Sequence, residues 1–429
     1  MADMQRLLAK AETGDASAQY AVGNAYHLGL GVPKSLPLAM RWYLKAAAQG
    51  HVDAQVNLGI VFVHDLGAAG GTRNPVQARY WFKRAAELGD AQAMAYLARI
   101  YLEGDGVPPN PARACDWLQR AGEQGYVDAY NELGVLLDSG RLGGAPDHAG
   151  AAAAYDRGAR LGDMRAQYNL ANCYLAGRGV EPNPALAAQW YRAAADQGLG
   201  EAQHTLATLL ARGVEGVERD PGQALKWLAK AADKGIAQAQ YELAKQLRAG
   251  DGIAADPLQA MHYYHEAADQ GHADAMFSLA LMLEVGAGLD RAYPERAAGW
   301  YQRLAQRHGH GGAAHNLGIL LAQGKGLPKD AGAARELFEL AVSLGADEAM
   351  HSLALLLVRG EGSAQDIVEG AKWAILALRD DPNGDARKLF DVIAALLPPQ
   401  LMEQAQAHAA SWQRTAKTVQ WDSEVAGTV

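Results

Sequence analysis

Small and large apolar residues recur along this chain at fixed distances from an alanine that returns every 36 to 39 residues. Four residues after this anchor comes Val22 or a leucine, five after it comes glycine or alanine, and eight after it comes a large residue such as Tyr26 or Phe62. Because offsets of 0, 4 and 8 fall on one face of an α-helix, each unit is predicted to begin with an amphipathic helix. The anchors are Ala18, Ala54, Ala93, Ala129, Ala166, Ala202, Ala239, Ala275, Ala313 and Ala349.

A second helix is predicted in each unit. The first helix is followed by a glycine-containing loop, such as those that begin at Gly29 and Gly104, and glycine supplies the left-handed backbone that ends a helix. An aromatic residue such as Trp42 or Trp190 marks the middle of the next segment, and a further glycine such as Gly50 closes it. Each unit is therefore predicted to be a helix–turn–helix pair, and repeats of this length stack into solenoids.

The pattern also predicts how the chain is divided. The predicted fold is all-α, an α/α solenoid of about ten helix–turn–helix repeats over residues 14–379. Residues 1–13 are predicted to form an N-terminal capping helix, because a solenoid needs a cover on its exposed end. Two further capping helices are predicted in residues 380–415, where Leu401, Ala405, Ala409 and Trp412 share a face. Residues 416–429 have no periodicity and are predicted to be disordered.

The repeated unit carries a resemblance to a known family. It has the form A-x-x-x-L-[GA]-x-x-[YFL], then G-x-G-[VIL]-x-x-[DN], then A-x-x-W-x-x-A-A-x-x-G, and it resembles the Sel-one-like repeat, a relative of the tetratricopeptide repeat. The resemblance implies helix pairs stacked into a right-handed superhelix and a role as an adaptor or scaffold of protein complexes. The fourth unit departs from the pattern, with Tyr155 near the tryptophan position, and so does the ninth, with Leu337 in it.

Composition and charge narrow the class of protein. The formal net charge is −9 and no run of five Lys or Arg occurs, whereas proteins that bind nucleic acid carry a basic stripe. No apolar stretch is long enough for a signal peptide or a membrane span. We therefore predict a cytoplasmic protein with neither a nucleic-acid partner nor a membrane partner.

Residues with catalytic or metal-binding chemistry are few. Cys115 and Cys173 do not make a disulfide scaffold and fit as small buried apolar residues. His308, His310 and His315 cluster, but no HExxH motif or matching carboxylate set accompanies them. The position of His315 is aromatic in other units, which favours a packing role. We predict no metal, no cofactor and no enzymatic activity.

The predicted partner-binding surface lies on the first helices, three and six residues after the anchors. These positions vary from unit to unit, are often polar, and lie away from the packing face. The resemblance implies that the first helices line the concave groove of the superhelix. The candidate groove residues are Asn24, Asn57, Tyr96, Arg99, Glu132, Asn169, Asn172, Thr205, Thr208, Glu242, Lys245, Ser278, Leu281, Asn316, Ile319 and Ser352.

The character of this surface changes along the chain. Asn169 and Asn172 are one helical turn apart, and an asparagine amide can pair with the backbone of an extended peptide. In the last units the position six residues after the anchor becomes apolar, with Leu281, Ile319 and Leu355. A partner with a charged end and an apolar end is therefore expected to match the groove.

The favoured hypothesis is a non-enzymatic adaptor, monomeric when unbound, that holds a protein or peptide in its groove. One alternative is a cytosolic neutraliser, an immunity-type protein that wraps a toxin or effector domain. A second is a structural, self-assembling protein, although terminal caps argue against open-ended stacking. A third is a cryptic hydrolase. The sequence alone does not identify the partner.

Overall fold

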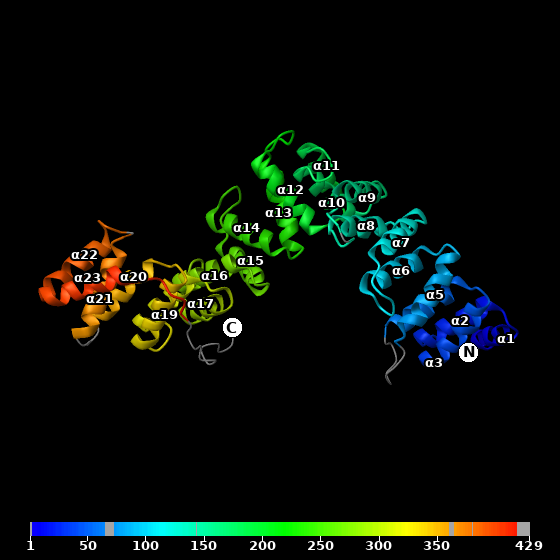
Figure 1. Cartoon of the computed structure of the whole chain (residues 1–429), viewed down its shortest axis with the longest axis horizontal. Helices are drawn as coiled ribbons and strands as arrows, with labels where there is room; N and C mark the ends of the chain where they lie inside the picture. The colour runs from blue at the N-terminus through cyan, green and yellow to red at the C-terminus, as the bar shows by residue number, and fades with distance from the viewer. Residues whose placement is uncertain (1, 65–72, 143, 360–363, 380, 418–429) are drawn as a thin grey trace. The chain divides into compact units, whose positions relative to one another are not determined.

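The computed structural model describes residues 2–64, 73–142, 144–359, 364–379 and 381–417. These residues form 23 helices, and the extended pairing among them is a single bridge between Val214 and Val217. The helices follow one another in pairs along the chain (Figure 1). The predicted all-α repeat fold is thus confirmed.

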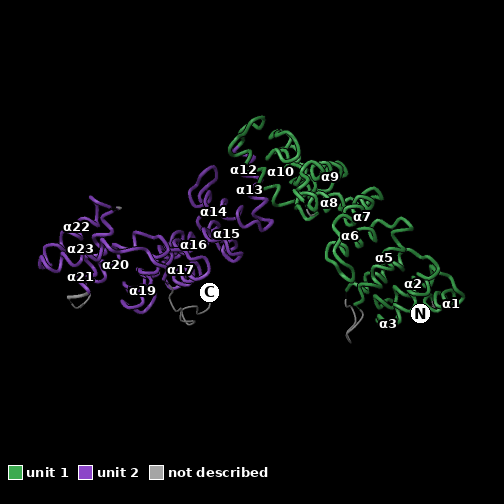
Figure 2. The backbone as a smooth tube through the Cα atoms, in the orientation of Figure 1, with its two compact units in different colours: residues 1–220 green, residues 221–429 purple. Residues whose placement is uncertain are grey.

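The described chain divides into two compact units, Met1–Asp220 and Pro221–Val429 (Figure 2). In the first unit a lone helix precedes five helix pairs and the first helix of a sixth. These helices are α1 (Ala2–Glu12), α2 (Ala16–Leu28), α3 (Leu36–Ala48), α4 (Val52–Val63), α5 (Pro75–Glu87), α6 (Ala91–Glu103), α7 (Pro111–Glu123), α8 (Asp128–Asp138), α9 (His148–Arg160), α10 (Met164–Ala176), α11 (Pro184–Asp196) and α12 (Gly200–Arg212).

The second unit begins with the second helix of the sixth pair, continues with four pairs and closes with two further helices. These are α13 (Pro221–Asp233), α14 (Ala237–Ala249), α15 (Pro257–Asp269), α16 (Ala273–Val285), α17 (Pro294–His308), α18 (Gly311–Gln323), α19 (Ala331–Ser343), α20 (Glu348–Arg359), α21 (Ala364–Ala377), α22 (Asp385–Leu396) and α23 (Pro399–Ser411). From α2 to α21, even-numbered helices are the first helices of their pairs and odd-numbered helices the second helices.

A small residue of the first helix and a large residue of the second close each pair. Gly59 of α4 lies against Phe82 of α5, and a Cβ added to this glycine would come within 2.5 Å of the ring. Gly318 and Phe338 meet in the same way, at 2.6 Å. The anchor alanines beside these glycines are buried, so the two helices approach each other closely over this face. The same contact joins Gly23 to Tyr43 and Gly134 to Tyr155.

In two pairs the most deeply buried ring of the second helix lies one position after the expected aromatic marker. Tyr43 is fully buried while Trp42 is half-buried, and Tyr191 is fully buried while Trp190 is half-buried. The tryptophan stacks instead under a basic side chain one turn later, as Lys45 does over Trp42 at 4.1 Å from the ring centroid. In these two pairs the repeat pattern located the second helix, but the ring that packs in the core is the neighbour of the tryptophan. In other pairs the tryptophan itself is buried, as Trp81 and Trp300 are, at 7% and 1% exposed.

Glycine ends most of the first helices as expected from their loops; α4 and α8 end instead at His64 and Ser139. Gly104 follows α6 with φ 74°, in the left-handed region, and its backbone N–H donates to the carbonyl of Ile100. A side chain at this position would also meet Pro109, whose ring would lie 2.6 Å from the added Cβ. These loops are structural turns, and Asn110 after the turn starts the second helix by accepting a hydrogen bond from Arg113 N–H at 3.0 Å.

Buried glutamines link successive helix pairs, a feature that the sequence pattern did not reveal. Gln19, one residue after its anchor, is 5% exposed and donates from Nε2 to the carbonyl of Ala11 at 3.0 Å. Gln49 at the end of α3 donates in turn to Gln19 Oε1 at 2.8 Å. One chain of hydrogen bonds thus joins the ends of three consecutive helices. The same chain runs from Gln197 through Gln167 to Ala159, and from Gln270 through Gln240 to Ala232.

Additional helices pack against the outer repeats of each unit. Ala11 of α1 is buried with Ala18 and Val22 of α2. At the other end, Ala405 and Ala409 of α23 are buried. The assignment of residues 1–13 and 380–415 as caps stays a prediction. Of the tail predicted at 416–429, residues 418–429 lie outside the described part of the chain.

The contact between Gly59 and Phe82 generates the first testable prediction. Alanine is the better helix former by ~1 kcal/mol, but overpacking a tight core costs about 1–3 kcal/mol. We expect Gly59→Ala to lower the local stability of α4 and α5 by about 1 kcal/mol, measured by native-state hydrogen exchange. Adding Phe82→Leu should restore protection, because the third pair carries Ala98 and Leu118 at these positions. If the losses of stability caused by Gly59→Ala and Phe82→Leu simply added in the double variant, the two residues would not be in the tight contact described.

The glutamine links generate a second prediction. Gln55 Oε1 is buried and has no hydrogen-bond partner among the described residues. Leu88 ends α5 with the same backbone conformation that Gln49 has at the end of α3. Leu88→Gln should therefore supply the missing donor and stabilise the chain by about 1 kcal/mol. Thermal denaturation should show a higher midpoint for this variant and a lower one for Gln49→Leu; an unchanged midpoint in both would exclude the link.

Candidate protein-binding surface

The candidate residues lie on the first helices, beside the buried anchor faces. Four of them, Arg99, Glu132, Lys245 and Leu281, are exposed, and the other twelve are half-buried. None is fully buried, so the surface they form is open to contact. We call these sixteen residues the first-helix surface and describe it within each unit separately.

Near the N-terminus, Asn24 and Asn57 meet at one tyrosine. The Tyr43 hydroxyl donates to Asn24 Oδ1 at 2.7 Å, and Asn57 Nδ2 donates to the same oxygen at 3.2 Å. His27 Nδ1 lies 3.1 Å from this hydroxyl. Burial raises the pKa of Tyr43 to about 12, so the hydroxyl stays protonated at neutral pH. The Asn24 oxygen is therefore already engaged inside the fold.

Tyr96, Arg99 and Glu132 form an aromatic and charged stretch in the same unit. The Tyr96 ring stacks on Phe82 with centroids 4.5 Å apart. The Arg99 guanidinium lies 5.5 Å from the Tyr96 centroid and attracts the Glu132 carboxylate of the next first helix. A planar aromatic side chain with a cation above it is a common anchor in protein interfaces.

Asn169 and Asn172 each use one group of their amide within the fold. Asn169 Nδ2 donates to Asn131 Oδ1 of α8 at 2.8 Å. Asn172 Oδ1 accepts from the hydroxyl of the fully buried Tyr191 at 2.5 Å. The two amides thus have different neighbours, and each is fixed in orientation by its own hydrogen bond.

The hydroxyl groups of Thr205 and Thr208 form hydrogen bonds with the backbone of their own helix. The Thr205 hydroxyl donates to the carbonyl of Glu201 at 2.9 Å, and the Thr208 hydroxyl donates to the carbonyl of His204 at 3.1 Å. A hydroxyl in such a bond offers a partner mainly its remaining acceptor capacity. This part of α12 is therefore less polar towards a partner than its sequence indicates.

In the second unit, Glu242 and Lys245 lie one turn apart on α14. Glu242 Oε1 accepts from Gln238 Nε2 at 2.8 Å, and the Lys245 ammonium lies 5.6 Å from the Tyr241 ring centroid. Lys245 is exposed. The first helix of this repeat therefore presents an exposed positive charge on its surface.

Two apolar positions of the last two repeats, Ile319 and Leu355, line a pocket of about 410 Å³. Its apolar wall includes Ile319 of α18, Phe338 of α19, and Leu355 and Leu356 of α20. Ile319 and Leu355 are separated by one repeat in the sequence, and both lie six residues after an anchor. The structure thus places two apolar positions of the predicted surface in one concave site, which we call the α18–α20 pocket.

Polar and charged groups border the same pocket. Ser352 lines it, and the Ser352 hydroxyl lies 2.8 Å from His315 Nε2. Burial lowers the pKa of His315, and the nearby His351 adds to this effect while Glu348 opposes it. Lys329 and Arg359 are exposed and also line the pocket, so its border is positively charged.

The remaining candidates lie outside this pocket. Leu281 of α16 is 39% exposed, and Ser278 is half-buried one turn before it. Asn316 of α18 reaches the hydroxyl of Tyr301, which donates to Glu284 Oε2 at 2.8 Å. These side chains extend the first-helix surface of the second unit but do not converge on one site.

Sequence reasoning missed the second-helix and loop residues of the α18–α20 pocket. Phe338 is a core ring whose edge is accessible from the pocket, and Lys329 belongs to the loop before α19. Arg359 ends α20. The repeat pattern marks only positions on the first helix, so the positive border became visible only when the loop was placed beside it.

The histidine cluster has a capping and packing role. His310 precedes α18, and its Nδ1 accepts a hydrogen bond from Ala313 N–H at 3.0 Å. The ring also lies 4.9 Å from that of Phe277. Within the described part of the chain, no three His, Cys, Asp or Glu side chains are placed to hold a metal ion. Among the same residues, no helix is long and apolar enough to cross a membrane.

The bond between Asn172 and Tyr191 generates a third prediction. Asn172→Ala leaves a buried hydroxyl without its acceptor, which costs about 1–3 kcal/mol. We expect a corresponding loss of hydrogen-exchange protection in α10 and α11. Removing the hydroxyl as well, in Asn172→Ala with Tyr191→Phe, should recover much of that protection. Thr205→Ala is the control, with an expected effect below ~0.5 kcal/mol. An equal loss of protection in Asn172→Ala and Thr205→Ala would refute a stabilising bond between Asn172 and Tyr191.

Comparison with known proteins identifies the repeats. The Sel1 repeat family model matches residues 16–51, 52–90, 91–126, 165–199, 200–236, 237–272, 273–308, 312–345 and 347–381. These nine matches cover well over half of the chain. The fourth pair, α8 and α9, falls between two matches, yet it has the same glycine-to-ring contact, from Gly134 to Tyr155.

Solved structures with similar folds include two repeat proteins from bacteria. The protective antigen c5321 of uropathogenic Escherichia coli, described as having an SLR fold, is 29% identical, with a TM-score of 0.65 over 98% of this chain and 92% of that one. A Sel1 repeat protein from Oxalobacter formigenes is 28% identical, with a TM-score of 0.56 over 83% of this chain and 91% of that one.

Curated relatives include two fungal regulators. Chitin synthase regulatory factor 3 of Schizosaccharomyces pombe is 31% identical over 48% of this chain and 22% of its own length. Chitin synthase regulator SKT5 of Saccharomyces cerevisiae is 29% identical over 48% of this chain and 31% of its own length. The match thus spans less than a third of each of these relatives. The family matches cover nine helix pairs and well over half of the chain, which therefore belongs to the Sel1 repeat family.

Proposed function

We propose that this chain is a non-enzymatic adaptor that binds another protein through its first-helix surface, with the α18–α20 pocket as the main docking point. The similarity to proteins named as regulators of chitin synthase supports a regulatory role that is exerted on another protein. Membership in a repeat family supports binding over a broad surface.

The observation that carries this proposal is the pocket itself. A pocket of about 410 Å³ has room for one or two large side chains, and Ile319, Phe338 and Leu355 give it an apolar wall. Burying one leucine-sized side chain there would contribute about 1.5–3 kcal/mol. Lys329 and Arg359 at its border favour a partner with an acidic group beside the apolar one.

The rest of the first-helix surface in the second unit fits a longer contact. Leu281 offers an exposed apolar side chain, and Lys245 an exposed charge. A partner that fills the α18–α20 pocket would meet these residues along successive first helices. An extended or helical segment with alternating apolar and polar groups has the required chemistry.

Several expectations about this adaptor stay predictions. They are a cytoplasmic location, a monomeric unbound state, the absence of a bound cofactor, and the division into caps, a solenoid over residues 14–379 and a tail. We also carry forward the hypothesis that neither nucleic acid nor membrane is a partner, on the basis of the net charge of −9.

A capture experiment tests the pocket and is the fourth prediction. The full-length chain is used as bait in native lysate, beside the variants Ile319→Asp and Leu355→Asp. A carboxylate on the wall removes the apolar contact that a partner's side chain would make there, and it repels the acidic group that Lys329 and Arg359 favour. Proteins that bind through the pocket should fall at least tenfold in abundance with both variants, as measured by quantitative mass spectrometry.

The matched control is Leu258→Asp. Leu258 on α15 is 58% exposed and does not line the pocket, so the same chemical change there should leave capture unaffected. Circular dichroism checks that all three variants keep their helicity. Proteins retained equally by wild type and both pocket variants would contradict the proposed docking point.

A further inference from the structure

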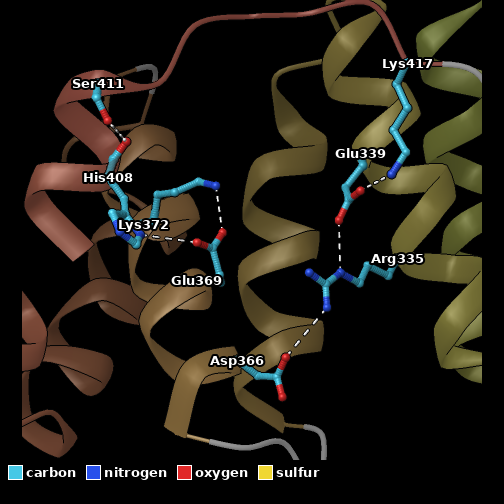
Figure 3. A network of polar contacts seen from close by, with 8 residues as sticks. All are labelled: Arg335, Glu339, Asp366, Glu369, Lys372, His408, Ser411 and Lys417. Carbon is cyan, nitrogen blue, oxygen red and sulfur yellow. Dashed lines mark hydrogen bonds and ion pairs between the residues drawn. The ribbon is translucent and has the colours of Figure 1, made fainter. Parts of the chain in front are cut away.

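The segment that follows α23 lies across α19 and α21. We call residues 412–417 the C-terminal strap. Trp412 packs edge-on against Trp373 of α21, with ring centroids 5.6 Å apart and an interplanar angle of 71°. At the other end of the strap, Lys417 forms an ion pair with Glu339 of α19 (Figure 3). Between them, Arg414 pairs with Asp347, which precedes α20.

The strap covers a groove on the second helices. This groove, which we call the α19–α21 groove, is lined by Glu339, Val342, Glu369 and Trp373, and a pocket of about 220 Å³ remains between these residues and the strap. It therefore combines an aromatic wall with two carboxylates and one ammonium group, that of Lys372, which lies 4.3 Å from the Trp373 ring centroid. It shares no lining residue with the α18–α20 pocket.

The Glu339 carboxylate of the groove binds one lysine of the strap and one arginine of its own helix. Glu339 accepts a hydrogen bond from Arg335 Nε at 2.9 Å and a second one from Lys417 (Figure 3). Burial tends to raise the pKa of Glu339, but the bonds from Lys417 and Arg335 outweigh it and hold the pKa below its usual value. Without Lys417, this half-buried carboxylate would keep Arg335, which also pairs with Asp366 at 3.6 Å.

Glu369 is the second carboxylate of the groove and has partners outside the strap. It pairs with Lys372 at 2.7 Å and with His408 of α23 at 3.3 Å (Figure 3). These three residues remain in place if the strap leaves, because they belong to α21 and α23. The strap is therefore held by its own side chains at a preformed site.

The hold of the strap on the groove is weak. Among the described residues it makes no backbone hydrogen bond to α19 or α21, so side chains alone attach it. Ion pairs at the surface contribute about 0–1 kcal/mol each, and an aromatic edge contact about 0.5–1.5 kcal/mol. Thr415 and Ala416 in its middle are exposed. A segment attached in this way can be displaced by a competitor.

We propose that the α19–α21 groove is a second docking surface for an extended peptide that carries an aromatic side chain and, five residues later, a lysine, and that the strap occupies it until such a partner displaces the strap. A tethered segment acts at an effective concentration on the order of millimolar, so it excludes weak ligands and yields to stronger ones. This surface goes beyond the proposed adaptor site and uses other residues.

A peptide-binding measurement tests this inference and is the fifth prediction. The probe is a fluorescein-labelled peptide with the sequence of residues 411–417, SWQRTAK, with blocked ends. The proteins are the full-length wild type and the full-length variant with Trp412→Ala, Arg414→Ala and Lys417→Ala. Fluorescence anisotropy should show at least tenfold tighter binding to the variant, because its own strap no longer competes.

The matched control adds Glu339→Gln to the triple variant, which should weaken peptide binding at least fivefold. A peptide with its tryptophan and lysine exchanged should also bind at least fivefold more weakly. Circular dichroism checks that the helices of each variant are intact. The single variant Lys417→Ala should also bind the peptide more tightly than wild type, with a smaller increase in affinity than the triple variant shows. Equal binding to wild type and the triple variant, or no binding to either, would overturn the inference. Neither result depends on Ile319 or Leu355, so failure of the adaptor proposal would be seen separately.

Discussion

The close approach of the two helices in each pair is the constraint on which the rest of the structure depends. In the pair of α4 and α5 a glycine must face the large residue of the second helix, because a Cβ at Gly59 would come within 2.5 Å of Phe82. This contact sets the spacing between the helices. It also fixes the rotation of the first helix, so that positions three and six residues after the anchor lie beside the buried face, where Asn24 and Asn172 accept hydrogen bonds from core tyrosines. The location of the proposed binding surface is thus a consequence of the packing rule.

The sequence predicted the helix pairs because this rule leaves a strict pattern at the anchor and at the small residue after it. In the pairs of α2 with α3 and α10 with α11 it did not predict the buried ring of the second helix, since Tyr43 and Tyr191 follow the more conspicuous tryptophans. The candidate asparagines were located correctly on the first helices, but their bonds to Tyr43 and Tyr191 connect residues 19 positions apart and have no local signature. The positive border of the α18–α20 pocket was also missed. Lys329 lies in a loop, and the repeat pattern marks only helix positions.

Two surfaces of different chemistry lie on the two kinds of helix in the last repeats. The α18–α20 pocket is apolar with a basic border, and the α19–α21 groove has an aromatic wall and two carboxylates. A chain with both can hold an acidic, apolar segment at one and a basic, aromatic segment at the other. This separation of charge would let an adaptor distinguish its partners by sign. Because the strap occupies the α19–α21 groove, only ligands that bind there more strongly than the strap would displace it.

The most direct test of the adaptor account is hydrogen–deuterium exchange of the full-length chain with and without its captured partner. The account predicts that the partner slows exchange in the described parts of α18 and α20, because their first-helix surfaces become covered. Protection should be weaker in α19 and α21, where the strap is already in place. Protection confined to the second helices, or to helices of the first unit, would contradict the α18–α20 pocket as the docking point.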